Sequence, residues 1–240
     1  MNNFELAAKC REIALNYKTL YVLGGIGYRL DAAGKQRALN AYEYNRKPAR
    51  KKMIEAASAD TWAFDCCGII KACLWDWRGL YDQTYGGAKY ASNGVPDIGA
   101  DAMIRVSKEV STDFSHIEIG EAVWKSGHIG VYIGNGLAVE CTPAWANKVQ
   151  ITAVGNIGSK PGYQTRMWTK HGKLPWVNYC PMGDVNFDGV VNSADARLAL
   201  RASVKLEKLT AAQILAADID GDGKVTAADA RAILNKAVKK

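Results

Sequence analysis

The sequence lacks the features that mark several common protein classes. It has no uninterrupted apolar run of about 18 residues, so it predicts no membrane-spanning helix. It has only three histidines, without HxxxH spacing, and six cysteines, without a CxxC pair. This usage disfavours a zinc site of Cys and His ligands. Six cysteines in 240 residues are also too few for a disulfide scaffold.

The composition is that of a globular protein. Apolar residues make up 48% and charged residues 23% of the chain, and 240 residues suit one large or two smaller domains. Most of the +7 net charge lies before residue 183, which favours anionic partners such as wall polymers. A solubilising surface explains the charge equally well. The basic residues are not interleaved with aromatic residues in the way typical of nucleic-acid-binding proteins, so we expect no nucleic-acid partner.

An internal repeat defines the C-terminal part of the chain. The segment from Asp184 to Asp195 recurs from Asp218 to Asp229, and each copy reads D-x-[ND]-x-D-G-x-x-[NT]-x-x-D. This spacing brings oxygen ligands together around a hard cation, with glycine at the sharp turn of loop position 6. Two acidic turns that merely cap helices are the alternative, but two copies in register favour calcium. The expected ligands are Asp184, Asn186, Asp188, the Val190 carbonyl, Asn192 and Asp195, then Asp218, Asp220, Asp222, the Lys224 carbonyl, Thr226 and Asp229.

The repeat resembles a type I dockerin. Each loop is followed by an amphipathic helix, and loop position 12 is Asp rather than the Glu of an ordinary EF-hand. The resemblance covers residues 183–240, after a linker at 179–182, and implies an all-α module that needs two calcium ions to fold. It also implies docking onto a cohesin of a scaffoldin. The expected cohesin contacts at loop positions 10 and 11 are Ser193, Ala194, Ala227 and Ala228, and the near-symmetry suggests that either copy could face the cohesin.

A cysteine at a helix start is the first candidate for catalysis. Apolar residues recur at helical spacing over 66–77, and Asp65 immediately before them is a good N-cap. Cys66 therefore lies in the first turn, where the helix dipole stabilises a thiolate. Cys67 falls off the apolar stripe. The alternative is that Cys66 is simply a small buried residue.

A histidine on a strand supplies the partner. Four segments after residue 115 alternate as strands, and His128 opens the second of them. We expect a three-residue hairpin loop, which pairs residue 130 with 140 and 128 with 142. His128 and Glu140 then share one face, and Glu140 can orient the imidazole. His116 and His171 are expected at the surface, residues 31–50 as irregular, and residues 1–18 and 49–58 as helices.

These segments resemble the NlpC-type cell-wall cysteine peptidases of the papain-like superfamily, in their phage-lysin branch. The resemblance rests on FDCCGII, GHIGVYIGNG and TLYVLGG and spans residues 1–178. It implies an α+β domain with N-terminal helices packed on an antiparallel sheet. It also implies Cys66 as nucleophile, His128 as base and Glu140 as orienter, without a catalytic cofactor. Tyr21 and Asp65 match positions that line the substrate site, and Cys67 replaces the family's serine.

Together the two resemblances imply an extracellular or cell-surface cysteine hydrolase of peptidoglycan stem peptides, carried on a scaffoldin. The bond after D-glutamate is the expected target, and apart from cohesin the chain is expected to be a monomer. The first residues show no signal sequence. Three alternatives stay open: an N-acetylmuramoyl-L-alanine amidase with the same triad, a catalytically silent binding module, and a calcium-regulated intracellular protease.

Overall fold

A curled sheet organises the body of the protein. The computed structural model describes residues 1–239, and within them seven strands form this sheet. Neighbouring strands run antiparallel except for the last two, which are parallel. Their spatial order is β4 (Lys108–Ser111), β10 (Lys170–Lys173), β5 (Ala122–Lys125), β6 (His128–Gly134), β7 (Leu137–Thr142), β8 (Lys148–Val154) and β9 (Thr165–Arg166).

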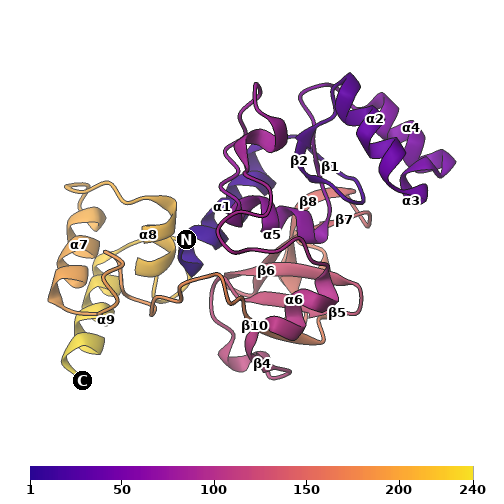
Figure 1. The fold of residues 1–240 in the computed structure, drawn as a ribbon. Coiled ribbons are helices and arrows are strands. Elements are labelled where there is room, and N and C mark those ends of the chain that lie inside the picture. The colour runs from indigo at the N-terminus through magenta and orange to yellow at the C-terminus, as the bar shows by residue number, and fades with distance from the viewer. Residues whose placement is uncertain (240) are drawn as a thin grey trace.

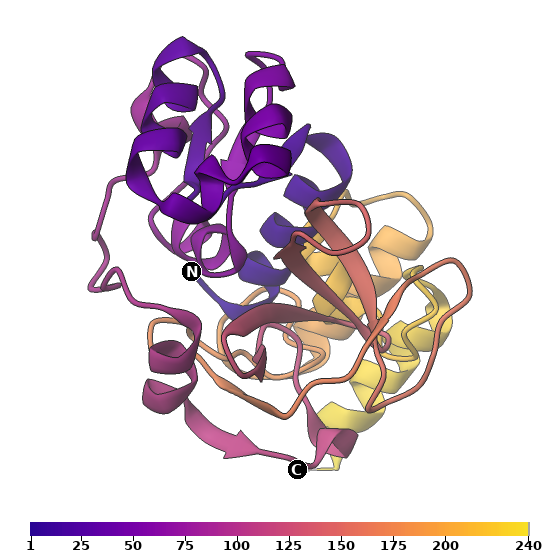
Figure 2. The same ribbon diagram turned by 90° about the vertical axis from the view of Figure 1, so that its right-hand side faces the viewer.

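Helices and a small sheet cover this framework (Figures 1 and 2). The small sheet has the order β1 (Thr19–Tyr21), β3 (Trp62–Phe64) and β2 (Ile26–Arg29). The helices of the body are α1 (Asn3–Asn16), α2 (Ala32–Ala41), α3 (Glu43–Arg46), α4 (Pro48–Ala56), α5 (Cys66–Leu74) and α6 (Ala100–Val106), with short 3-10 turns η1 (Thr84–Gly87) and η2 (Phe114–His116). The α+β class expected from the sequence is confirmed.

Several expectations about the body need correction. Residues 31–50 form α2, α3 and the start of α4 rather than irregular structure, because Asp31 caps α2 and Pro48 opens α4. The helix expected over 66–77 ends at Leu74, although Trp77 beyond it stays buried in the core. No helix within residues 1–239 has the length and apolarity needed to cross a bilayer.

The β6–β7 hairpin has the expected pairing but reaches it by a different turn. Gly130 pairs with Glu140, as predicted, and Tyr132 pairs with Ala138. The loop has two residues rather than three, with Asn135 and Gly136 both at positive φ. A bulge between Tyr132 and Gly134 takes up the extra residue. The bulge restores the face that a two-residue loop alone would have reversed.

Up to residue 239, the C-terminal unit has three helices, and it packs directly on the body. Helices α7 (Ser193–Ser203), α8 (Ala211–Ala217) and α9 (Ala227–Val238) enclose a small core of their own. Figure 1 shows α8 between the other two helices and α1. Phe4 of α1 stacks on Phe187 with ring centroids 6.0 Å apart. Residues 179–182, expected as a linker, are also tied down, since the Cys180 amide donates to Asn3 Oδ1 at 3.0 Å.

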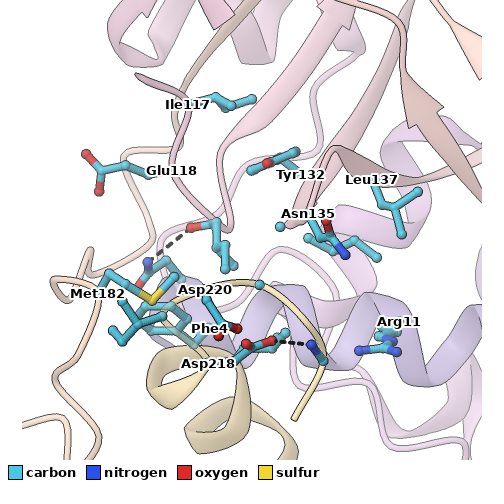
Figure 3. Close-up of a pocket in the computed structure, with 18 of the residues that line it drawn as sticks. Phe4, Arg11, Ile117, Glu118, Tyr132, Asn135, Leu137, Met182, Asp218 and Asp220 are labelled. Carbon is cyan, nitrogen blue, oxygen red and sulfur yellow. Dashed lines mark hydrogen bonds between the residues drawn. The ribbon is translucent and has the colours of Figure 1, made fainter. Parts of the chain in front are cut away.

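A cavity of about 400 Å³ lies between the body and the C-terminal unit (Figure 3). Phe4 and Arg11 of α1 line it from one side, and Tyr132 and Asn135 of the β6–β7 hairpin line it from another. Asp218, at the start of the second repeat, lines it from the C-terminal unit. The two units therefore share an interface that is partly packed and partly open.

Candidate active site

Cys66 lies at the junction of β3 and α5. Asp65 caps the helix with Oδ1, which accepts from the Gly68 amide at 2.6 Å, while Oδ2 accepts from the Gly24 amide at 2.7 Å. Gly68 is required here, because a Cβ would lie 1.7 Å from the Gly25 carbonyl oxygen. These contacts hold the helix start against the loop that follows β1. The Cys66 side chain is consequently fixed at the first turn of α5.

The surroundings of Cys66 favour its thiolate. The pKa of Cys66 is lowered to about 5, and the largest contribution comes from a hydrogen bond with the Cys67 thiol, whose Sγ is 3.8 Å away, against the opposing effect of burial. The nearby His128 ring and the Ile129 amide contribute to the same lowering of the pKa. The same contact with Cys66 raises the pKa of Cys67, so Cys67 remains a neutral donor. Cys66 is thus a candidate nucleophile, and the candidate base His128 lies within reach of it.

Glu140 holds the other side of the His128 ring. Its Oε2 lies 2.7 Å from His128 Nε2, which leaves Nδ1 for the thiol. Burial lowers the pKa of His128, but the hydrogen bonds to Cys66 and Glu140 outweigh it, and the pKa lies above its usual value. His128 is therefore poised as an imidazolium beside a thiolate.

Glu140 is kept ionised by partners that the sequence did not reveal. It is fully buried and accepts from Thr152 Oγ1 at 2.7 Å and from Arg166 Nε at 2.7 and 2.8 Å. Burial raises the pKa of Glu140, but the bonds from His128 and Arg166 bring it below its usual value. Arg166 lies on the two-residue strand β9, which is too short to leave a periodic pattern in the sequence.

Trp168 is a second residue that sequence reasoning missed. Its ring stacks on the His128 imidazole, with centroids 5.5 Å apart and planes 8° apart. Gly130 allows this, because a Cβ there would lie 3.3 Å from the Trp168 ring and 2.7 Å from the Val139 carbonyl oxygen. Trp168 therefore occupies the space that Gly130 leaves beside His128. Stacking and the Glu140 bond together fix the plane of the imidazole.

A cleft of about 620 Å³ opens in front of Cys66. Tyr21 and Asp65, the expected substrate-site residues, both line it. Burial raises the pKa of Asp65 to about 6, and the neighbouring Cys66 thiolate contributes to the rise. Charged side chains of both signs line the cleft: Lys71, which is buried and paired with Asp97, and the exposed Asp101 and Arg105. The cleft can thus contact both amino and carboxylate groups of a ligand.

The other two histidines lie apart from this cleft. His116 is exposed, as expected. His171 was expected at the surface, but it is 4% exposed and hydrogen bonded to Glu121. Its Nε2 also lies 2.9 Å from the Asp113 carbonyl oxygen. The expectation was wrong because the polar residues around His171 in the sequence hide its place on β10, which lies between β4 and β5 in the sheet.

The two repeats have oxygen donors suited to calcium. In the second loop, carboxylate oxygens of Asp218, Asp220 and Asp222 lie within 4.8 Å of one another. Gly223 and its counterpart Gly189 take positive φ at loop position 6. Burial raises the pKa of Asp184 and Asp218, and nearby carboxylates raise both further. A divalent cation would relieve this repulsion, so the donor set fits a hard ion.

The remaining expected ligands have definite places around the loops. Asp195 and Asp229 accept backbone amides from the start of their own loops, at Val185 and Ile219. The side chains of Asn192 and Thr226 cap α7 and α9. The expected ligands Asn186, Asp188, Val190 and Lys224 are exposed on the loops. Of the expected cohesin contacts, Ser193, Ala227 and Ala228 are exposed and Ala194 is half-buried.

Comparison with known proteins supports the C-terminal assignment directly. Residues 182–238 match the family model described as the dockerin type I domain, so this unit is a dockerin type I domain. No curated protein matches the chain. The solved P60 domain of an antigen from M. avium subspecies paratuberculosis is similar over 71% of this chain and 96% of that chain, at 16% identity and a TM-score of 0.37. So low a TM-score says nothing about the reaction.

Proposed function

We propose that the body is a cysteine hydrolase of peptidoglycan stem peptides, carried by its dockerin. The observation that carries this proposal is the position of His128 between Cys66 and Glu140. The ring lies beside the Cys66 thiol, which raises the pKa of His128, and its Nε2 lies 2.7 Å from a buried carboxylate oxygen of Glu140. A nucleophile, a base and a group that orients the base are the minimum for acyl transfer to sulfur.

In the proposed reaction the Cys66 thiolate attacks the scissile carbonyl. Backbone N–H groups at the start of α5 stabilise the oxyanion, helped by the helix dipole. The His128 imidazolium gives its proton to the leaving amine, and the amide C–N bond breaks. His128 then takes a proton from water, and the resulting hydroxide equivalent releases the acid product from Cys66. Glu140 stays ionised throughout and holds the ring.

The substrate class is supported by the sequence motifs around Cys66 and His128 and by the charges of the cleft. A stem peptide carries free carboxylates and a free amine, and the cleft offers Lys71 and Arg105 alongside Asp97 and Asp101. The bond after D-glutamate is our preferred target. The dockerin would carry two calcium ions, bind a cohesin of a scaffoldin outside the cell, and supply no catalytic group.

The test is mass spectrometry of purified peptidoglycan digested by the wild type, Cys66→Ala and Cys67→Ala. We expect new free amino termini on stem peptides with the wild type, none with Cys66→Ala, and retained products with Cys67→Ala. Their sequence identifies the bond. Free lactyl ends on the glycan would instead show that the activity is that of an amidase rather than an endopeptidase. Products from Cys66→Ala would refute the nucleophile, and no products from the wild type would favour a silent binding module.

A further inference from the structure

The sulfur atoms of the two neighbouring thiols lie closer together than their adjacency on a helix requires. Adjacent residues of a helix point about 100° apart, so their sulfurs are not close by default. Here Cys66 Sγ and Cys67 Sγ are 3.8 Å apart. Two sulfurs bound at about 2.3 Å to one tetrahedral zinc ion are about 3.8 Å from each other. The observed pair matches this separation without any movement.

A third ligand lies beside the two sulfurs. A carboxylate oxygen of Asp65 and both Sγ atoms are all within 4.8 Å of one another. Asp65 is held in place by the amides of Gly68 and Gly24, and each of its oxygens keeps a further lone pair. All three residues line the cleft, so an ion can enter from solvent and keep its fourth position for water.

We propose that Asp65, Cys66 and Cys67 form a binding site for a thiophilic divalent cation, with zinc as the physiological example. Two thiolates and one carboxylate are ligands that zinc takes readily. Hard ions such as calcium and magnesium prefer all-oxygen sites, so the dockerin loops and this site select different metals. Because the ion occupies the nucleophile, it blocks hydrolysis; this consequence, unlike binding itself, rests on the proposed function.

The chain contains a matched control for the sulfur spacing. Cys10 Sγ and Cys73 Sγ are also 3.8 Å apart, but both residues are sealed in the core between α1 and α5. No carboxylate, imidazole or third thiol joins them in a ligand group within residues 1–239. The Cys10–Cys73 pair should therefore bind no ion, because it has the sulfur spacing but neither access to solvent nor a third ligand.

The experiment titrates Co²⁺ into the reduced, calcium-saturated full chain and follows thiolate-to-cobalt charge-transfer absorption. We expect one equivalent to bind in the wild type and in Cys73→Ala. Cys67→Ser and Asp65→Asn should each bind at least about tenfold more weakly, because each loses a ligand. Absence of the band in the wild type, or a band unchanged in Cys67→Ser, would overturn the proposal.

Inhibition separates this proposal from the proposed function. Zn²⁺ should inhibit peptidoglycan hydrolysis by the wild type, and the inhibition constant should rise at least about tenfold in Cys67→Ser when each variant is compared with its own uninhibited rate. A charge-transfer band without any hydrolysis would support the metal site and refute the hydrolase. Hydrolysis without a band, or without zinc inhibition, would refute the metal site alone.

Discussion

Replacing Glu140 by Gln tests the mechanism most sharply, because it removes a charge and little volume. Glu140 is fully buried, and its carboxylate accepts hydrogen bonds from His128 and Arg166. A hydrogen bond to a charged group contributes about 1.5–3 kcal/mol. Because this bond stabilises the thiolate–imidazolium pair that attacks the substrate, its loss lowers kcat/KM by about 10- to 150-fold, at about 1.4 kcal/mol per factor of ten.

The pH profile distinguishes this role from a structural one. The thiolate–imidazolium pair exists above the pKa of Cys66, about 5, and below the raised pKa of His128. Glu140 raises the pKa of His128, so its loss lowers that pKa and moves the basic limb of the profile to lower pH. The assay is the release of amino termini from soluble peptidoglycan fragments, measured from pH 4 to pH 10.

Glu121→Gln is the matched control. Glu121 is 3% exposed and pairs with the buried His171, so the change removes a comparable buried charge away from the cleft. Its thermal unfolding should shift while its pH profile stays that of the wild type. The reasoning fails if Glu140→Gln keeps activity within about twofold, or if it loses activity with the basic limb unmoved.

Two further predictions concern the dockerin. Removing calcium with EDTA, or changing Asp184→Asn together with Asp218→Asn, should unfold the C-terminal unit and lower its helical circular dichroism. The reason is that the loop carboxylates then lose the cation that offsets their mutual repulsion. An unchanged spectrum would contradict metal-dependent folding. Phe187→Ala should lower the unfolding free energy by about 1–2 kcal/mol in denaturant titrations, because it removes a half-buried ring that stacks on Phe4. Val190→Ala, which changes an exposed side chain on the same loop, should lower it little. Equal effects of the two changes would mean that the stacking contributes nothing.

The sequence predicts best where a pattern is local. The helix start at Cys66 follows from Asp65 and the apolar spacing behind it, and the dockerin domain follows from the internal repeat. The predicted pairing of Gly130 with Glu140 was also correct, although the predicted loop length was wrong. Alternation of apolar and polar residues identifies which side chains share a face of a strand, whereas a bulge produces no recognisable pattern in the sequence.

The missed parts of the site come from residues that act across the sheet. Arg166 and Trp168 approach Glu140 and His128 from a short, irregular stretch that has no periodicity of its own. Likewise, nothing near His171 in the sequence indicates that Glu121, on a distant segment, will pair with it. Such contacts depend on strand order, which a single sequence does not encode locally.

The packing of the dockerin on α1 has a mechanical consequence. An enzyme on a flexible tether searches a sphere around its anchor, and its local concentration at any surface is set by the length of the tether. Here Phe187 and α8 rest on the body, and residues 179–182 are pinned to Asn3. A partner that binds the exposed ends of α7 and α9 would therefore hold the cleft in one fixed orientation relative to itself. Where the scaffold is mounted would decide which polymer strands the cleft can meet.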